Sequence, residues 1–272
     1  MDAHAASRVG GPAQRGTLLV GVLLLVALAA WIVTIDRMTG MDAGPGTALG
    51  GLGWFTGVWV TMMAAMMLPS TAPAVLLFSR TAARSARPAP ATAAFVGGYL
   101  AVWTAFGLVA YGLYRAIVAL DPPVMAWDRG GPWIAGGAVA LAGLYQLSPL
   151  KRVCLRHCRS PLHFLLARWH PGPTGALRMG AEHGAWCAGC CWALMLVLFA
   201  VGVMSILWMA VVALIVLAEK VLPPGERIAR ALAVALLAFG VWIAVAPGSV
   251  PGLTDPAAAS GGGMMPAPMM DQ

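Results

Sequence analysis

Long runs of apolar residues are the feature that most restricts how this chain can fold. Thr17 to Ile35 is an uninterrupted apolar stretch of nineteen residues, and about 20 such residues suffice to cross a bilayer as a helix. Hydrophobic residues make up 60% of the chain and charged residues only 10%, more apolar surface than a soluble domain of this length buries. We therefore predict an all-α transmembrane bundle, because helices satisfy their own backbone hydrogen bonds in lipid.

Further apolar stretches predict about seven spans in total. After the first, they are 54–78, 92–120, 132–147, two halves of 186–218 divided near 202–205, and 228–245. The stretch 186–218 is divided because its thirty-three residues would make one helix of about 50 Å. For the first stretch, a cleaved signal peptide ending near Ala29 is the alternative, but the apolar run continues beyond that point.

The predicted spans define three parts of the chain. A transmembrane domain over 17–247 follows a short N-terminal tail, 1–16, and precedes a tail rich in Met, Pro and Gly, 248–272, which we expect to be disordered. Within the domain, 150–185 is the longest polar segment and is predicted to be a Cys- and His-containing loop.

The positive charges predict an orientation. Of the seventeen Lys and Arg residues, only Arg37, Arg115 and Arg129 fall on one side of the predicted bundle. Since cytoplasmic loops carry the excess of Lys and Arg, this asymmetry predicts a bacterial inner-membrane protein with its N-terminus inside and its C-terminus outside. The membrane orientation then explains the net charge of +7, and we expect lipid rather than nucleic acid as the partner.

All five cysteines lie in two short segments, KRVCLRHCR and HGAWCAGCCW. The candidate ligands in them are Cys154, His157, Cys158, His183, Cys187, Cys190 and Cys191. On a helix, the last four share one face. Thiolate and imidazole suit soft metal ions, so we predict a metal site at the cytoplasmic face, with copper favoured and zinc as the alternative.

Two other readings of the cysteines stay open. Buried cysteines often serve only as small apolar residues. Cys187 and Cys190 also form a C-x-x-C pair, which we expect at the start of a helix, where the dipole would favour the thiolate.

Methionines cluster just before a proline in the second predicted span. Met63, Met66 and Met67 are neighbours on one helical face, and Pro69 follows them. Thioethers beside an interrupted helix are candidate Cu(I) ligands. Packing is the alternative, because methionine fills irregular gaps between helices.

Common catalytic motifs are missing from the sequence, which makes an enzyme the less favoured class. The sequence contains no Walker loop, no dinucleotide-binding glycine pattern, no serine nucleophile elbow and no HExxH.

Two charged residues, Glu219 and Lys220, end an apolar run, and we interpret them as a pair of interfacial anchors.

Three segments carry a resemblance to a known family. At MMAAMMLPSTAP, YQLSPLKRVCLRHCRSPL and HGAWCAGCCWALMLVLFAVGVMSILWMA followed by EK, the sequence resembles a bacterial family of predicted metal-binding integral membrane proteins with a domain-of-unknown-function label, sometimes described as copper chaperones. The similarity covers about residues 50 to 240. It implies a metal-binding membrane protein without a settled activity, and it carries the site onto the five cysteines, with His157 and His183 as companions.

We therefore expect a protein that stores or delivers a soft metal, or inserts it into a membrane oxidase or oxygenase. One alternative is an accessory subunit of a multi-component membrane enzyme with a structural metal. A membrane thiol oxidoreductase is the other.

Overall fold

The computed structural model describes residues 12–39, 49–83, 87–120, 129–202 and 205–250. Within these ranges the chain forms nine α-helices and one short 3-10 turn, and no strand. The predicted all-α class is therefore confirmed. The predicted disorder of the C-terminal tail concerns residues almost entirely outside the described ranges.

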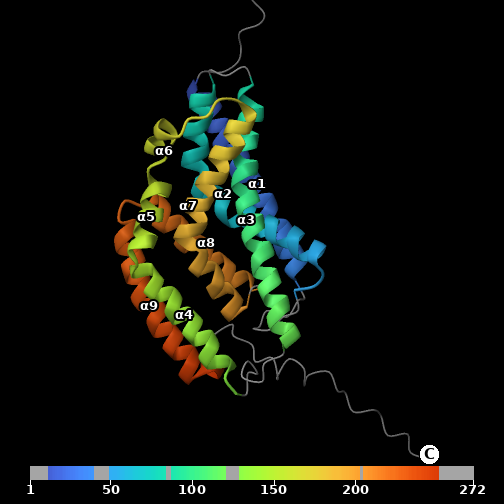
Figure 1. Cartoon of the computed structure of the whole chain (residues 1–272), viewed down its shortest axis with the longest axis vertical. Helices are drawn as coiled ribbons and strands as arrows, with labels where there is room; N and C mark the ends of the chain where they lie inside the picture. Colours follow the sequence, from blue (N-terminus) through green and yellow to red (C-terminus); the bar gives the residue numbers. More distant parts are fainter. Residues whose placement is uncertain (1–11, 40–48, 84–86, 121–128, 203–204, 251–272) are drawn as a thin grey trace, which may run out of the picture.

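The helices form an elongated bundle (Figure 1). They are α1 (Pro12–Met38), α2 (Leu52–Ala82), α3 (Pro88–Leu120), α4 (Gly131–Leu147), α5 (Pro149–Arg159), α6 (Pro161–Ala167), α7 (Gly172–Val201), α8 (Ile206–Val221) and α9 (Gly225–Val245). At the lower end of Figure 1, α4 and α9 lie side by side. The start of α1 and the end of α9 lie at opposite ends of the bundle.

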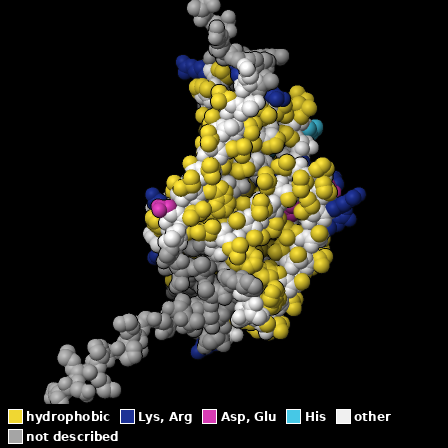
Figure 2. All heavy atoms as spheres, turned by 180° about the vertical axis from the view of Figure 1, so that it is seen from behind, with side chains coloured by type: hydrophobic (Ala, Val, Ile, Leu, Met, Phe, Trp, Pro, Cys, Tyr) yellow, Lys and Arg dark blue, Asp and Glu magenta, His cyan; other side chains and the backbone are white. Residues whose placement is uncertain are grey.

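Five of these helices are long and apolar enough to cross a membrane: α1, α2, α3, α7 and α9. A sixth span arises if α4 and α5, which meet at an angle of 66°, are counted as one broken crossing. The remaining long apolar helix, α8, has 16 residues. Apolar side chains cover most of the face in Figure 2, and Lys and Arg gather in small groups near its margin. By their length and composition, these helices indicate a membrane-spanning protein.

The segment 150–185, predicted to be a loop, is mostly helical. It contains α5, α6 and the first half of α7. The sequence around Ser148 explains the start of α5, because its side chain accepts a hydrogen bond from the Lys151 backbone N–H at 3.1 Å and Pro149 occupies the first turn. Both are typical helix-start signals, and they turn the chain sharply after α4.

Glycines let two pairs of helices approach each other closely. A Cβ atom on Gly98 of α3 would collide with the Leu177 carbonyl of α7, and one on Gly136 of α4 would collide with the Gly240 carbonyl of α9. Small residues at such contacts allow the backbones to touch, which is how helices commonly associate in membranes. The α3–α7 contact fixes the position of the helix that carries three of the cysteines.

The apolar stretch 186–218 is broken where the sequence analysis divided it. α7 ends at Val201 and α8 begins at Ile206. Gly202, at φ +117°, occupies a backbone conformation that L side chains rarely adopt. α8 then turns back toward the middle of α7, where Lys220 near its end contacts Cys187.

Candidate metal centre

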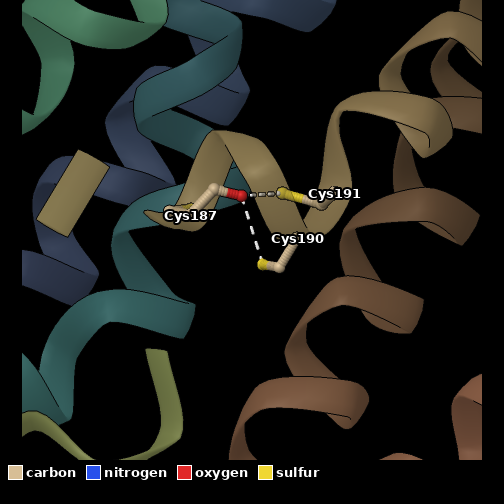
Figure 3. Close-up of side chains that lie close together, drawn as sticks. All are labelled: Cys187, Cys190 and Cys191. Carbon is tan, nitrogen blue, oxygen red and sulfur yellow. Dashed lines mark hydrogen bonds between the residues drawn. The ribbon is translucent and has the colours of Figure 1, made fainter. Parts of the chain in front are cut away.

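Three cysteines of α7 bring their sulfur atoms together. The sulfur atoms of Cys187, Cys190 and Cys191 all lie within 4.8 Å of one another, and all three side chains are buried. Figure 3 shows the thiols of Cys190 and Cys191 near the Cys187 carbonyl oxygen, to which they donate hydrogen bonds of 3.1 and 2.9 Å. The predicted i, i+3, i+4 spacing on one helical face is therefore present. Among the described residues, no histidine or carboxylate atom joins this group.

α5 brings a fourth cysteine from a distant part of the sequence. The sulfur of Cys158 lies 3.8 Å from that of Cys190. α5 approaches α7 closely beside Gly189, where an added Cβ would stand only 2.8 Å from the Cys154 sulfur. The Gly189 carbonyl also accepts a hydrogen bond from the Tyr145 hydroxyl. The two cysteine segments recognised in the sequence thus meet in space, and we call Cys158, Cys187, Cys190 and Cys191 the thiol cluster.

The two histidines expected to accompany the cysteines have other neighbours. The His157 ring stacks on Trp186 with centroids 4.1 Å apart, and its Nδ1 lies 2.9 Å from the Val153 carbonyl. His183 is buried, with Nε2 3.1 Å from the Thr71 hydroxyl. Each ring is therefore oriented by contacts outside the thiol cluster.

The methionines of α2 are part of the protein interior. Met63, Met66 and Met67 are at most 2% exposed and belong to the same apolar cluster as the cysteines of α7. α2 continues through Pro69 to Ala82, and the Ser70 hydroxyl donates to the Met67 carbonyl at 2.9 Å. Such burial agrees with a packing role and leaves their coordination of copper untested.

Lys220 is the residue of this site that sequence reasoning misassigned. It is only 9% exposed, and its Nζ lies 2.8 Å from the Cys187 sulfur and 3.3 Å from the Ser70 hydroxyl. The Tyr99 hydroxyl lies 3.0 Å from the same sulfur. Positive charge beside a cysteine stabilises its thiolate, the form that binds metals.

Glu219 is also buried, so the predicted pair of interfacial anchors is wrong. Its carboxylate accepts a hydrogen bond from Lys151 at 2.6 Å and another from Gln146 at 3.2 Å. Both members of the Lys151–Glu219 pair are at most 2% exposed. The Arg159 guanidinium donates to the Glu219 backbone carbonyl at 2.6 Å, which fixes the end of α8 against α5. A charged residue inside a membrane protein is itself a signal of a functional site, and it was available in the sequence.

The donor set of the thiol cluster suits a soft metal ion. Thiolates select Cu(I) and zinc, and four of them are the ligand set of a common structural zinc site. The C-x-x-C pair does not begin a helix as expected, because Cys187 lies fifteen residues after the start of α7 at Gly172. The helix dipole falls off within the first turn, so Lys220 and not the dipole supplies positive charge here.

A comparison with protein-family models finds one family that matches most of the chain. Residues 56–243 match the family PpoB2, described as copper chaperone. The chain belongs to this copper-chaperone family. The match extends from α2 to α9 and includes every member of the thiol cluster. No curated protein and no solved structure matched the chain.

Proposed function

We propose that this protein binds Cu(I) at the thiol cluster and delivers it to another membrane protein. The observation that carries the proposal is the meeting of Cys158 with the α7 cysteines, 3.8 Å from the Cys190 sulfur. Sulfur atoms from segments about thirty residues apart have no need to converge for packing alone, whereas a metal ion requires convergent donors. Membership of a copper-chaperone family favours copper over zinc.

The proposed primary ligands come from the four cysteines of the thiol cluster. Other candidates from the sequence would act around them rather than with them: Cys154, His157, His183, Met63, Met66 and Met67. The methionines lie in the same apolar interior as the cysteines. Thioethers there suit transient binding of Cu(I) on its way to the thiolates, because they are neutral and soft.

The recipient proposed here is a copper-dependent oxidase or oxygenase of the same bacterial inner membrane. We propose about seven spans, with α8 as the shortest crossing, the N-terminus inside and the C-terminus outside. The opposite placement of the start of α1 and the end of α9 supports an odd number of crossings. A reporter fused after Gln272 tests this topology, and a cytoplasmic signal there contradicts it.

Metal analysis of the purified full-length protein tests the copper site. Cells grown with both copper and zinc should yield protein that contains copper, and X-ray absorption should show sulfur as its neighbour. One tightly held zinc per chain, unaffected by added Cu(I), would instead favour an accessory subunit with a structural metal. Protein that binds neither ion overturns the proposed function.

One observation favours a thiol oxidoreductase as a second candidate. The 3.8 Å separation of the Cys158 and Cys190 sulfurs allows these thiols to exchange with a partner's disulfide. They would form an internal disulfide while the partner's two sulfurs leave as thiols. Mass spectrometry after treatment with oxidised glutathione should then find a Cys158–Cys190 bond that dithiothreitol reverses, in protein prepared without metal.

A further inference from the structure

Among the described residues, no carboxylate partners the buried ammonium group of Lys220. Its polar contacts are the Cys187 sulfur at 2.8 Å and the Ser70 hydroxyl at 3.3 Å. The adjacent carboxylate, Glu219, is paired with Lys151. Among the described residues, no Asp or Glu lies within ion-pair distance of Lys220 Nζ.

Burying an unpaired charge is costly, so the interior must supply a negative group for Lys220. The charges of Lys151 and Glu219 cancel each other. Tyr99 contributes a neutral hydroxyl 3.0 Å from the Cys187 sulfur. The sulfur atoms of the thiol cluster are therefore the groups that can balance the ammonium.

The hairpin of α7 and α8 fixes this contact. Cys187 lies fourteen residues before the end of α7 at Val201, and Lys220 lies fourteen residues after the start of α8 at Ile206. Because α8 turns back toward α7 after equal numbers of residues, the Lys220 side chain reaches Cys187. The ammonium is thus held by secondary structure and not by a loop.

We propose that Lys220 is the permanent counter-ion of the copper site and limits Cu(I) to two thiolate ligands. This inference rests on the proposed function. One Cu(I) with two thiolates carries a charge of −1, which one ammonium neutralises. A third thiolate would add a negative charge that this ammonium does not compensate, among side chains that are mostly buried. Of the four sulfurs present, Cys187 and one partner thiol would hold the ion, and the other two would not bind it.

Affinity for Cu(I), measured against a competing coloured Cu(I) chelator without oxygen, tests the role of the charge. Lys220→Met should weaken Cu(I) binding by about 10- to 100-fold, the usual cost of losing a group that supports a metal ligand. Lys220→Arg keeps the charge and should retain most of the affinity. Tyr99→Phe is the matched control, because it removes a neutral hydrogen bond to the same sulfur.

A purely structural role for Lys220 predicts a different pattern. Lys220→Arg would then weaken binding as much as Lys220→Met, and that result overturns the inference. Equal losses for Lys220→Met and Tyr99→Phe do the same. X-ray absorption measures the number of sulfur ligands in the unmodified protein, so it does not depend on whether a variant folds. Two sulfurs per copper support the inference, and three or four overturn it. In each of these contradicting cases the protein still binds copper, so the proposed function stands, whereas unmodified protein without Cu(I) affinity overturns both.

Discussion

The α4–α9 pair and the junction of α5, α7 and α8 differ in the kind of groups that lie between their helices. α4 and α9 touch backbone to backbone at Gly136 and Gly240. The junction instead contains five buried or half-buried thiols, two buried lysines and a buried glutamate. Close packing of small residues can hold helices together in lipid without charged groups, and burying charged groups at the junction costs desolvation energy. We therefore propose that the junction is the functional region and that the α4–α9 pair is its scaffold.

The largest effect should come from removing the sulfur that Lys220 contacts. Cys187→Ser should reduce Cu(I) affinity by more than the about 10- to 100-fold expected for supporting groups, because it removes a proposed ligand and the partner of the ammonium. Chelator competition measures the loss. Cys154→Ser is the control, since Cys154 packs beside Gly189 outside the thiol cluster. Equal losses in the two variants would show that the junction is not centred on Cys187.

Breaking the buried ion pair should destabilise the junction as a structure. Lys151→Met leaves the Glu219 carboxylate buried without its cation, and the free energy of unfolding should fall by about 3–5 kcal/mol. Unfolding in detergent measures this. Adding Glu219→Gln should restore most of the stability, because the double variant buries no unpaired charge. If the double variant is no more stable than Lys151→Met, the ion pair is not the cause.

A smaller effect is expected in the scaffold. Gly136→Val inserts a side chain against the Gly240 carbonyl, and overpacking of this kind costs about 1–3 kcal/mol. Gly137→Val is a matched control, because an added Cβ at Gly137 meets nothing within 4 Å. Thermal unfolding should separate the two, while the copper content of the folded protein stays unchanged. A loss of copper in Gly136→Val would remove the distinction between scaffold and site.

The smallest effect is predicted for His157. His157→Phe preserves the stacking on Trp186 and removes both ring nitrogens. We expect no change in copper stoichiometry or affinity, because the ring is oriented toward Trp186 and the Val153 carbonyl. A clear drop in Cu(I) affinity would contradict this prediction and indicate that His157 is a ligand.

Periodicity predicted the helical face of α7, and the length of the apolar stretch 186–218 predicted the break near Gly202, because both are local properties of the sequence. The prediction of a loop over 150–185 was wrong because charged residues dominate α5, and only the Ser148-Pro149 start signal indicated a helix. Glu219 and Lys220 were misassigned because their position at the end of an apolar run says nothing about α5 or α7. Their partners lie 68 and 33 residues away in the sequence, a distance that pattern reasoning does not bridge.

The equal arms of the α7–α8 hairpin make helix length a determinant of chemistry. A residue inserted into α8 between Ile206 and Lys220 turns the end of that helix by about 100°. Lys220 would then leave Cys187, and Glu219 would leave Lys151, although every side chain of the site is still encoded. Spacing inside an otherwise featureless hydrophobic segment is thus as much a part of this site as its cysteines.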